Sequence, residues 1–234
     1  MSERPHRASA RPDLVRDDPW WRCALFVVGG LFRLSHRLRI EGLERIPAAG
    51  PAILAANHVS PLDPVAIAIA ASMRGRTIRY LGAAEVFRIP VIGWVLRRLR
   101  QIPLHRGKGD RAAIEDAAGV IASGSLAGIH PEGRLGTGEA LLPARRGAAR
   151  LAIAAGAPLV PIGVWGMQWR WPRGGIKLRR PLRPVAALVI GDPIRPGGLG
   201  NADDDIQDLT DRVMRSIEGL IERAKIVAGD RTSL

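Results

Sequence analysis

Residues 57–64 read Asn-His-Val-Ser-Pro-Leu-Asp-Pro and separate two apolar runs. The first run, residues 52–56, is short and bounded, which is typical of a buried strand, and the second run begins at Val65 and fits a helix. A strand that enters a helix through a short turn is the repeating unit of an open α/β sheet. Such sheets place their sites at this junction. The stretch therefore predicts both a fold class and the position of a site.

Two residues of this stretch carry the candidate chemistry. His58 is a candidate general base because neutral imidazole titrates near neutrality, and Asp63 would fix its tautomer and stabilise the imidazolium. On one helix, residues five positions apart point about 140° away from each other, so His58 must precede the helix. Ser60 as the N-cap and Pro61 at the first helical position would supply that boundary, with Asp63 at the third.

The same stretch also has a purely structural interpretation. Asp63 would then complete a variant capping box, and His58 would bond to the backbone of a turn. Because short motifs often occur without function, these eight residues do not decide between the two interpretations.

Composition limits the class of protein. The 234 residues are 47% hydrophobic and 24% charged, which suits one globular domain, but the formal net charge is +13. Such a charge favours a polyanionic partner, either nucleic acid or an anionic membrane leaflet. The single cysteine, Cys23, excludes an internal disulfide and a multi-cysteine metal site, and we expect it to be a small buried hydrophobic residue.

The chain divides into a short start and one domain. Residues 1–19 lack a hydrophobic signal core and predict a flexible segment, and residues 20–234 form a single domain ending in an amphipathic helix over 203–227. No apolar run approaches the roughly 20 residues that span a bilayer. We therefore expect a cytoplasmic protein that contacts a membrane only from its surface.

Residues 20–38 predict an amphipathic helix at the start of the domain. Its arginines and paired tryptophans suit the membrane interface, although an ordinary packed helix has the same period. The expected apolar face carries Trp21, Ala24, Leu25, Val28, Leu31, Phe32 and Ser35, and the opposite face carries Arg22, Gly29, Arg33, His36 and Arg37.

Apolar strand patterns alternate with helical patterns through most of the chain, which predicts an open, mainly parallel sheet flanked by helices. Three of these strands end in polar clusters, at residues 57–58, 105–106 and 130–133. If the strands are neighbours, a general base, an arginine and a carboxylate share one crevice.

These clusters, in this order, resemble the motifs of the glycerolipid acyltransferase family, which includes the 1-acyl-glycerol-3-phosphate acyltransferases. The first motif, Asn-His-x4-Asp, matches completely at residues 57–63. The third, Phe-Pro-Glu-Gly, matches except that His130 replaces Phe, and the second, Ile-Pro-Val-Asp-Arg-Gly, matches at residues 102–107 with His105 replacing Asp. With a fourth, apolar motif at residues 160–163, the order is specific where one motif would be weak.

The resemblance implies an O-acyltransferase. His58, paired with Asp63, would deprotonate the free hydroxyl of a lysophospholipid, with 1-acyl-glycerol-3-phosphate giving phosphatidic acid. The alkoxide would attack an acyl thioester of coenzyme A or acyl carrier protein, which serves as co-substrate without a further cofactor or metal. The residues implied in acceptor binding are Asn57, Arg106, Glu132, Gly133, Arg134 and Arg145, with Glu132 orienting a hydroxyl or an arginine.

Departures from the family motifs, at His105, His130 and Arg134, leave other acceptors open, such as a glycolipid or an acylated amino lipid. A zinc hydrolase built on His58, His105 and His130 matches no metal motif. A nucleic-acid module has no supporting signature, and a catalytically inactive lipid-binding relative remains an alternative. We expect an enzyme on the cytoplasmic face of the cell membrane, bound peripherally to anionic lipids and not to nucleic acid.

Overall fold

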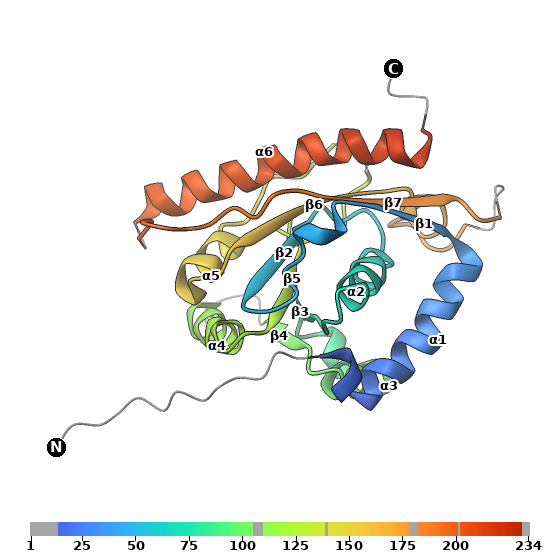
Figure 1. The fold of residues 1–234 in the computed structure, drawn as a ribbon, viewed down its shortest axis with the longest axis horizontal. Coiled ribbons are helices and arrows are strands. Elements are labelled where there is room, and N and C mark those ends of the chain that lie inside the picture. The colour runs from blue at the N-terminus through green and yellow to red at the C-terminus, as the bar shows by residue number, and fades with distance from the viewer. Residues whose placement is uncertain (1–13, 105–109, 139, 178–181, 201, 231–234) are drawn as a thin grey trace.

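The computed structural model describes residues 14–104, 110–138, 140–177, 182–200 and 202–230. These residues form a seven-stranded sheet in the order β1-β7-β6-β2-β5-β3-β4 (Figure 1). Only the β6–β7 pair is antiparallel, so the predicted open, mainly parallel sheet is confirmed. The strands are β1 Arg37–Glu41, β2 Ala52–Ala56, β3 Arg79–Ala83, β4 Ile102–Leu104, β5 Leu126–Ile129, β6 Leu159–Trp165 and β7 Val185–Ile190.

Helices cover both faces of the sheet. The α-helices are α1 Pro19–Ser35, α2 Asp63–Met73, α3 Pro90–Arg98, α4 Asp110–Ala122, α5 Gly147–Ala155 and α6 Asp203–Ala228, and the 3-10 helices are η1 Val15–Asp17, η2 Leu43–Arg45, η3 Val86–Arg88 and η4 Met167–Trp169. The central strand β2 is buried throughout and alternates between two cores. Leu54 packs with α1 and α2, and Ile53 packs with α4, α5 and α6.

The register of β2 and β5 brings two of the polar clusters together. Ala55 lies opposite Ile129, so the turn after β2 and the loop after β5 leave the sheet at the same edge. Strand β4 lies two places from β5, beyond β3. Residues 105–109, which include the predicted site residue Arg106, lie outside the described residues.

The start of α2 differs from the prediction. The helix begins at Asp63 with Leu62 as its N-cap, so Ser60 is not the cap and Pro61 lies outside the helix. The reason is a tight turn, in which the Asp63 N–H donates to the Ser60 carbonyl at 3.1 Å. Asp63 is therefore the first helical residue and not the third.

The packing of α1 also differs from the prediction. Gly29 and His36, both assigned to the face opposite the apolar one, are buried, whereas Leu31 is 62% exposed. Gly29 faces α2, where an added Cβ would make an ordinary contact 4.0 Å from Ile69. Cys23 is exposed, so the expectation of a buried cysteine is wrong. None of the helices within the described ranges is long and apolar enough to cross a membrane.

Candidate active site

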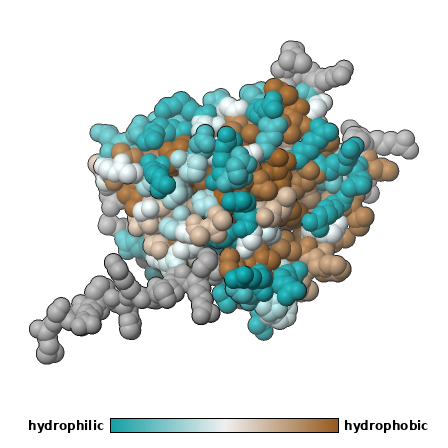
Figure 2. Space-filling view, in the orientation of Figure 1, coloured by the Kyte–Doolittle hydropathy of each residue, from teal (hydrophilic) through white to brown (hydrophobic). Residues whose placement is uncertain are grey.

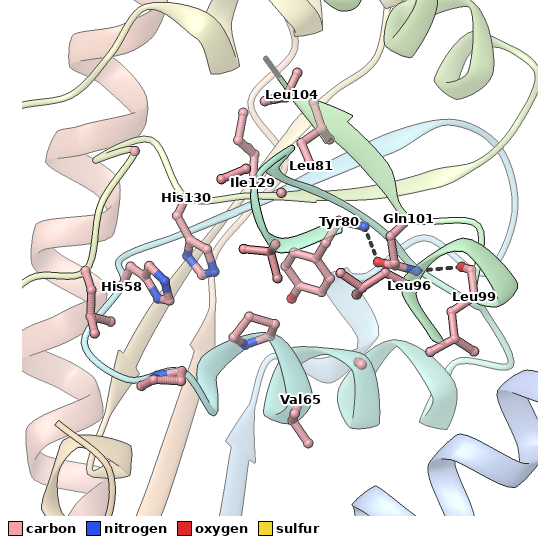
Figure 3. A pocket seen from close by; sticks show the side chains of 18 of the residues that line it. His58, Val65, Tyr80, Leu81, Leu96, Leu99, Gln101, Leu104, Ile129 and His130 are labelled. Atoms are coloured by element: carbon pink, nitrogen blue, oxygen red, sulfur yellow. Dashed lines mark hydrogen bonds between the residues drawn. The ribbon is translucent and has the colours of Figure 1, made fainter. Parts of the chain in front are cut away.

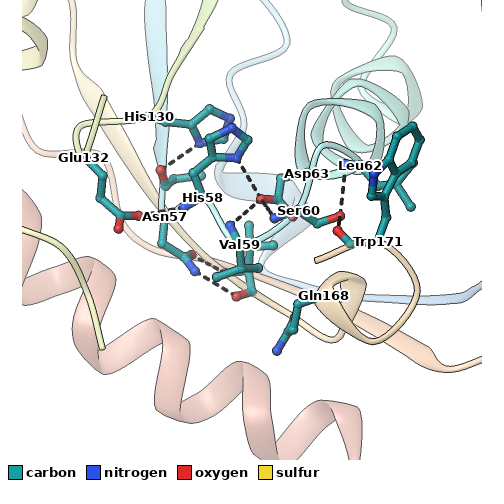
Figure 4. Close-up of polar contacts among 12 residues, drawn as sticks. Asn57, His58, Val59, Ser60, Leu62, Asp63, His130, Glu132, Gln168 and Trp171 are labelled. Atoms are coloured by element: carbon teal, nitrogen blue, oxygen red, sulfur yellow. Dashed lines mark hydrogen bonds and ion pairs between the residues drawn. The ribbon is translucent and has the colours of Figure 1, made fainter. Parts of the chain in front are cut away.

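The candidate base and its carboxylate meet at the edge of the sheet. His58 Nδ1 lies 3.0 Å from Asp63 Oδ2, and the Asp63 side chain is fully buried while that of His58 is 20% exposed (Figure 4). The pairing follows from a histidine before the helix and an aspartate at its first position. His58 Nδ1 thus faces the carboxylate, which leaves Nε2 as the nitrogen available to a substrate hydroxyl.

The turn itself holds Asp63 in place. Its Oδ2 atom also accepts the backbone N–H groups of Val59 at 2.7 Å and Ser60 at 2.8 Å. Ser60 in turn donates its hydroxyl to the Trp171 carbonyl at 2.7 Å, which ties the turn to the segment after η4. Rotation of the carboxylate would break three contacts to one oxygen, so the pair is positioned in advance.

Burial controls the charge of the pair. It lowers the pKa of His58 to about 4, so the imidazole is neutral at neutral pH, as a general base must be. Burial also raises the pKa of the Asp63 carboxyl to about 7, against the opposing effects of His130 and of the Ser60 and Val59 N–H groups.

Glu132 and Gly136, in the loop after β5, hold the backbone of His58. Glu132 Oε1 accepts the His58 N–H at 2.7 Å, and the Gly136 N–H donates to the His58 carbonyl at 2.7 Å. The second Glu132 oxygen accepts the Leu142 N–H at 3.0 Å, and the residue is 4% exposed. Both carboxylate oxygens accept backbone N–H groups, so Glu132 holds the turn in place. Its predicted role in orienting a hydroxyl or an arginine stays a prediction.

Asn57 likewise faces the protein. Its Nδ2 donates to the Val164 carbonyl at 3.0 Å and its Oδ1 accepts the Val164 N–H at 2.7 Å, and the residue is 2% exposed. The side chain continues the pairing of β2 with β6 beyond the last β2 residue. The predicted contact with substrate does not fit this orientation, and Asn57 instead fixes the start of the turn.

A cavity of about 810 Å³ opens beside His58, and its lining residues fall into two sets, which we call its apolar arm and its basic arm. One arm is apolar and lies under α1, α2, β3 and α3 (Figure 3), with lining residues that include Leu25, Val65, Leu81, Leu96, Leu104 and Ile129. The other arm is basic, and the arginines that line it are Arg134, Arg145, Arg146 and Arg150. The candidate base thus shares one cavity with apolar residues suited to a hydrocarbon chain and with arginines suited to an anion.

The basic arm contains three of the predicted acceptor-binding residues. Gly133, Arg134 and Arg145 all line it. Gly133 has φ +65°, and an added Cβ would lie 2.7 Å from the Arg145 side chain, so only glycine lets Arg145 cross the loop. Arg146 lies 3.4 Å from Asp203 of α6, so that cation is partly neutralised by the protein.

The sequence did not indicate that His130 and Tyr80 are neighbours in the cavity wall. The rings of His58 and His130 stack with centroids 4.0 Å apart, and Tyr80 lies on the other side of His130 with centroids 6.0 Å apart (Figure 3). Nothing local marks Tyr80, although it is the only tyrosine of the chain. Its position depends on β3 lying beside β5.

The described residues include no group of three or more His, Cys, Asp or Glu side chains that could hold a metal ion. The stack explains why two neighbouring histidines do not form such a site. Their rings lie face to face at 8°, and His130 Nδ1 contacts the Ala56 carbonyl at 3.0 Å, so the nitrogens do not converge on one point.

Comparison with known proteins places this site in a family. Residues 37–165, more than half of the chain, match the family model described as Acyltransferase. The chain belongs to the acyltransferase family. This match contains β1 to β6, the turn with His58 and Asp63, and the loop with Glu132, so the candidate base and the residues that hold it lie within the matched segment.

Several relatives of this acyltransferase-family chain are similar over most of its length. An uncharacterised protein of Mycobacterium tuberculosis is 28% identical over 86% of this chain, which covers 64% of that relative's length. The 1-acyl-sn-glycerol-3-phosphate acyltransferase of Bacillus subtilis is 24% identical over 70% of this chain and 77% of its own. A chloroplast enzyme of the same name from Brassica napus is 29% identical over 59% of this chain and 40% of its own.

The fold of this family member also matches a solved structure. The 1-acyl-sn-glycerophosphate acyltransferase PlsC from Thermotoga maritima superimposes with a TM-score of 0.70, covering 88% of this chain and 79% of that one. At 22% identity the likeness concerns the fold, which is again an α/β sheet flanked by helices.

Proposed function

We propose that this protein transfers a fatty acyl group from an acyl thioester to the free hydroxyl of a lysophospholipid, with 1-acyl-glycerol-3-phosphate as the acceptor and phosphatidic acid as the product. The observation that carries the proposal is that His58 lines one cavity together with the residues of the apolar arm and the arginines of the basic arm. The acyl chain would occupy the apolar arm, and the acceptor phosphate would contact Arg134 and Arg145.

The proposed acyl transfer follows from the pairing of His58 with Asp63. His58 Nε2 accepts the proton of the acceptor hydroxyl while Asp63 holds the Nδ1–H and stabilises the imidazolium. The hydroxyl oxygen bonds to the thioester carbonyl carbon, and the carbon–sulfur bond breaks. The departing thiolate then takes the proton from the imidazolium, which restores neutral His58. Coenzyme A or acyl carrier protein would be the leaving thiol.

The outer surface of α1 and α3 supports action at a membrane. We define the α1–α3 surface by its exposed apolar side chains, which are Phe26, Val27, Leu31 and Leu34 of α1 and Val91, Ile92 and Val95 of α3. In Figure 2 hydrophobic side chains gather along the side of the molecule where Figure 1 places α1. Exposed apolar patches of this kind mark interaction surfaces.

Cations lie among these apolar side chains. Arg98 stacks over Trp20 of α1 at 4.8 Å and Trp94 of α3 at 5.8 Å, and Arg22 and Arg33 of α1 are exposed. Arginine and tryptophan suit the headgroup region of an anionic leaflet. Because the inner sides of the same helices line the apolar arm, peripheral docking at the cytoplasmic leaflet would bring lipid substrates to the cavity.

A panel assay tests the proposed function. Anionic vesicles would carry lysophosphatidic acid, other lysophospholipids, a lysoglycolipid or an acylated amino lipid, each with acyl groups on coenzyme A or on acyl carrier protein. We expect transfer with the highest kcat/KM for lysophosphatidic acid. A higher value for another acceptor would correct the acceptor, and vesicle binding without transfer to any acceptor would indicate an inactive relative.

A further inference from the structure

The apolar arm contains two polar atoms that the proposed reaction does not use. Tyr80 Oη and His130 Nε2 are buried and have no hydrogen-bond partner among the described residues. Both residues line the cavity, and in Figure 3 the hydroxyl end of Tyr80 lies on the side of its ring toward His130. Buried polar groups are normally paired, so two such atoms in one cavity wall indicate a ligand that pairs them.

The hydrogen-bonding roles of these atoms are complementary. His130 Nδ1 faces the Ala56 carbonyl at 3.0 Å, and because a carbonyl only accepts, the proton is on Nδ1. Burial lowers the pKa of His130 to about 4, so the ring is neutral and Nε2 is an acceptor. Burial, with the Asp63 charge nearby, raises the pKa of Tyr80, so its hydroxyl keeps its proton as a donor.

The position of Tyr80 is built into the fold. Its ring lies against Gly128 of β5, where an added Cβ would come within 2.5 Å of the ring. Its backbone N–H donates to Gln101 Oε1 at 2.7 Å, and Gln101 in turn donates to the Leu99 and Ile78 carbonyls. The phenol is therefore held at a fixed place in the wall of the apolar arm.

We infer that the acyl donor carries a hydroxyl on one of the first carbons beyond its carbonyl, and that this hydroxyl donates to His130 Nε2 and accepts from Tyr80 Oη. The inference rests on the proposed function, which puts the thioester at His58 and the chain in the apolar arm. The rings follow the order His58, His130 and Tyr80, so the carbons next to the carbonyl pass the two polar atoms.

A reaction intermediate explains the pair less well. The negative oxygen formed on the thioester carbonyl needs donors, and neutral His130 presents a lone pair at Nε2. A hydroxyl is both donor and acceptor, and it satisfies both atoms at once. An unsubstituted chain would leave the two polar atoms buried and unpaired, which weakens its binding.

Binding of unreactive donor analogues tests the inference without requiring transfer. The probes are acyl-pantetheine amides with an unsubstituted, a 2-hydroxy or a 3-hydroxy dodecanoyl chain, because the pantetheine arm is common to both carriers. Calorimetric titration of the full chain should show at least one hydroxylated analogue binding about 10-fold or more tightly than the unsubstituted one. Equal affinities, or no binding of either hydroxylated analogue, would overturn the inference.

Variants identify the residues responsible. Tyr80→Phe keeps the ring against Gly128, and His130→Phe keeps the stack, and each should reduce the preference for the hydroxylated analogue to about 3-fold or less. Leu96→Val, which changes the same arm without a polar group, should weaken all analogues by the same factor and leave the preference unchanged. If Tyr80→Phe also weakens all analogues equally, the hydroxyl is not recognised by Tyr80. Transfer of unsubstituted chains to a lysolipid would still support the proposed function in that case.

Discussion

In most proteins charged side chains are exposed and large apolar side chains are buried. The turn at residues 57–63 and the α1–α3 surface depart from this distribution in opposite directions. The turn buries a carboxylate, Asp63, that is 0% exposed, and the surface exposes an aromatic ring, Phe26, that is 83% exposed. In the turn Asp63 Oδ2 contacts the His58 ring and accepts two backbone N–H groups, while Asp63 Oδ1 has no hydrogen-bond partner among the described residues. On the surface nothing within the described residues covers the apolar groups. The first region thus uses its own chain as partner, and the second indicates a partner outside it.

The largest expected effect comes from breaking the charge pairing in the turn. Asp63→Asn would remove the charge that stabilises the imidazolium. Its amide oxygen would stay at the Oδ2 position, because the Val59 and Ser60 N–H groups donate there. We expect kcat to fall by about 10²–10⁴, measured with the best acceptor and donor. Asp192→Asn, which removes an exposed carboxylate outside the turn, should keep normal turnover. Near-normal kcat in Asp63→Asn would show that the carboxylate is not needed.

The hydrogen bonds between Asn57 and Val164 of β6 should contribute to the free energy of unfolding. Asn57→Ala leaves the N–H and the carbonyl of Val164 without their partner, and both are buried. We expect the free energy of unfolding to fall by roughly 2–4 kcal/mol in a urea titration. An unchanged urea midpoint would mean that water or a shift of the turn replaces the asparagine.

The sequence predicted the turn better than the surface, because the turn depends on local spacing. The strand over residues 52–56 and the pairing of His58 with Asp63 both followed from a short apolar run and five positions. The burial of Gly29 depends instead on Ile69 of another helix, which no period in α1 reveals. The position of Tyr80 could not be predicted either, because it also depends on contacts with a distant element. Its neighbours Gly128 and His130 belong to β5 and the loop after it.

The α1–α3 surface can be tested by giving it charge. The double variant Phe26→Asp, Val91→Asp replaces side chains that are 83% and 74% exposed. We expect binding to anionic vesicles to weaken about 10-fold or more, since two apolar side chains that would be partly buried in the membrane interface are lost and negative charge is added. Ile226→Asp changes an exposed residue on α6 and should leave vesicle affinity unchanged. Equal losses in the double variant and the α6 variant would contradict a defined docking surface.

The smallest expected effect is the response of the turn to pH. The base works when His58 is neutral and Asp63 is ionised. Burial lowers the pKa of His58 to about 4 and raises that of Asp63 to about 7, so acidification through pH 7 protonates the carboxylate first. We expect kcat/KM to decrease as the pH falls through about 7, with the unfolding free energy recorded at each pH as control. A rate that stays constant down to pH 5 would contradict this assignment.

The role of His58 as general base is tested most directly by the rate of acyl transfer with and without its side chain. Labelled acyl transfer to lysolipid in anionic vesicles would be compared between the natural protein and His58→Ala, with circular dichroism to verify that both are folded. We expect product from the natural protein and a loss of at least about 100-fold in the folded variant. A folded His58→Ala variant with near-normal turnover would contradict the claim that His58 is the general base.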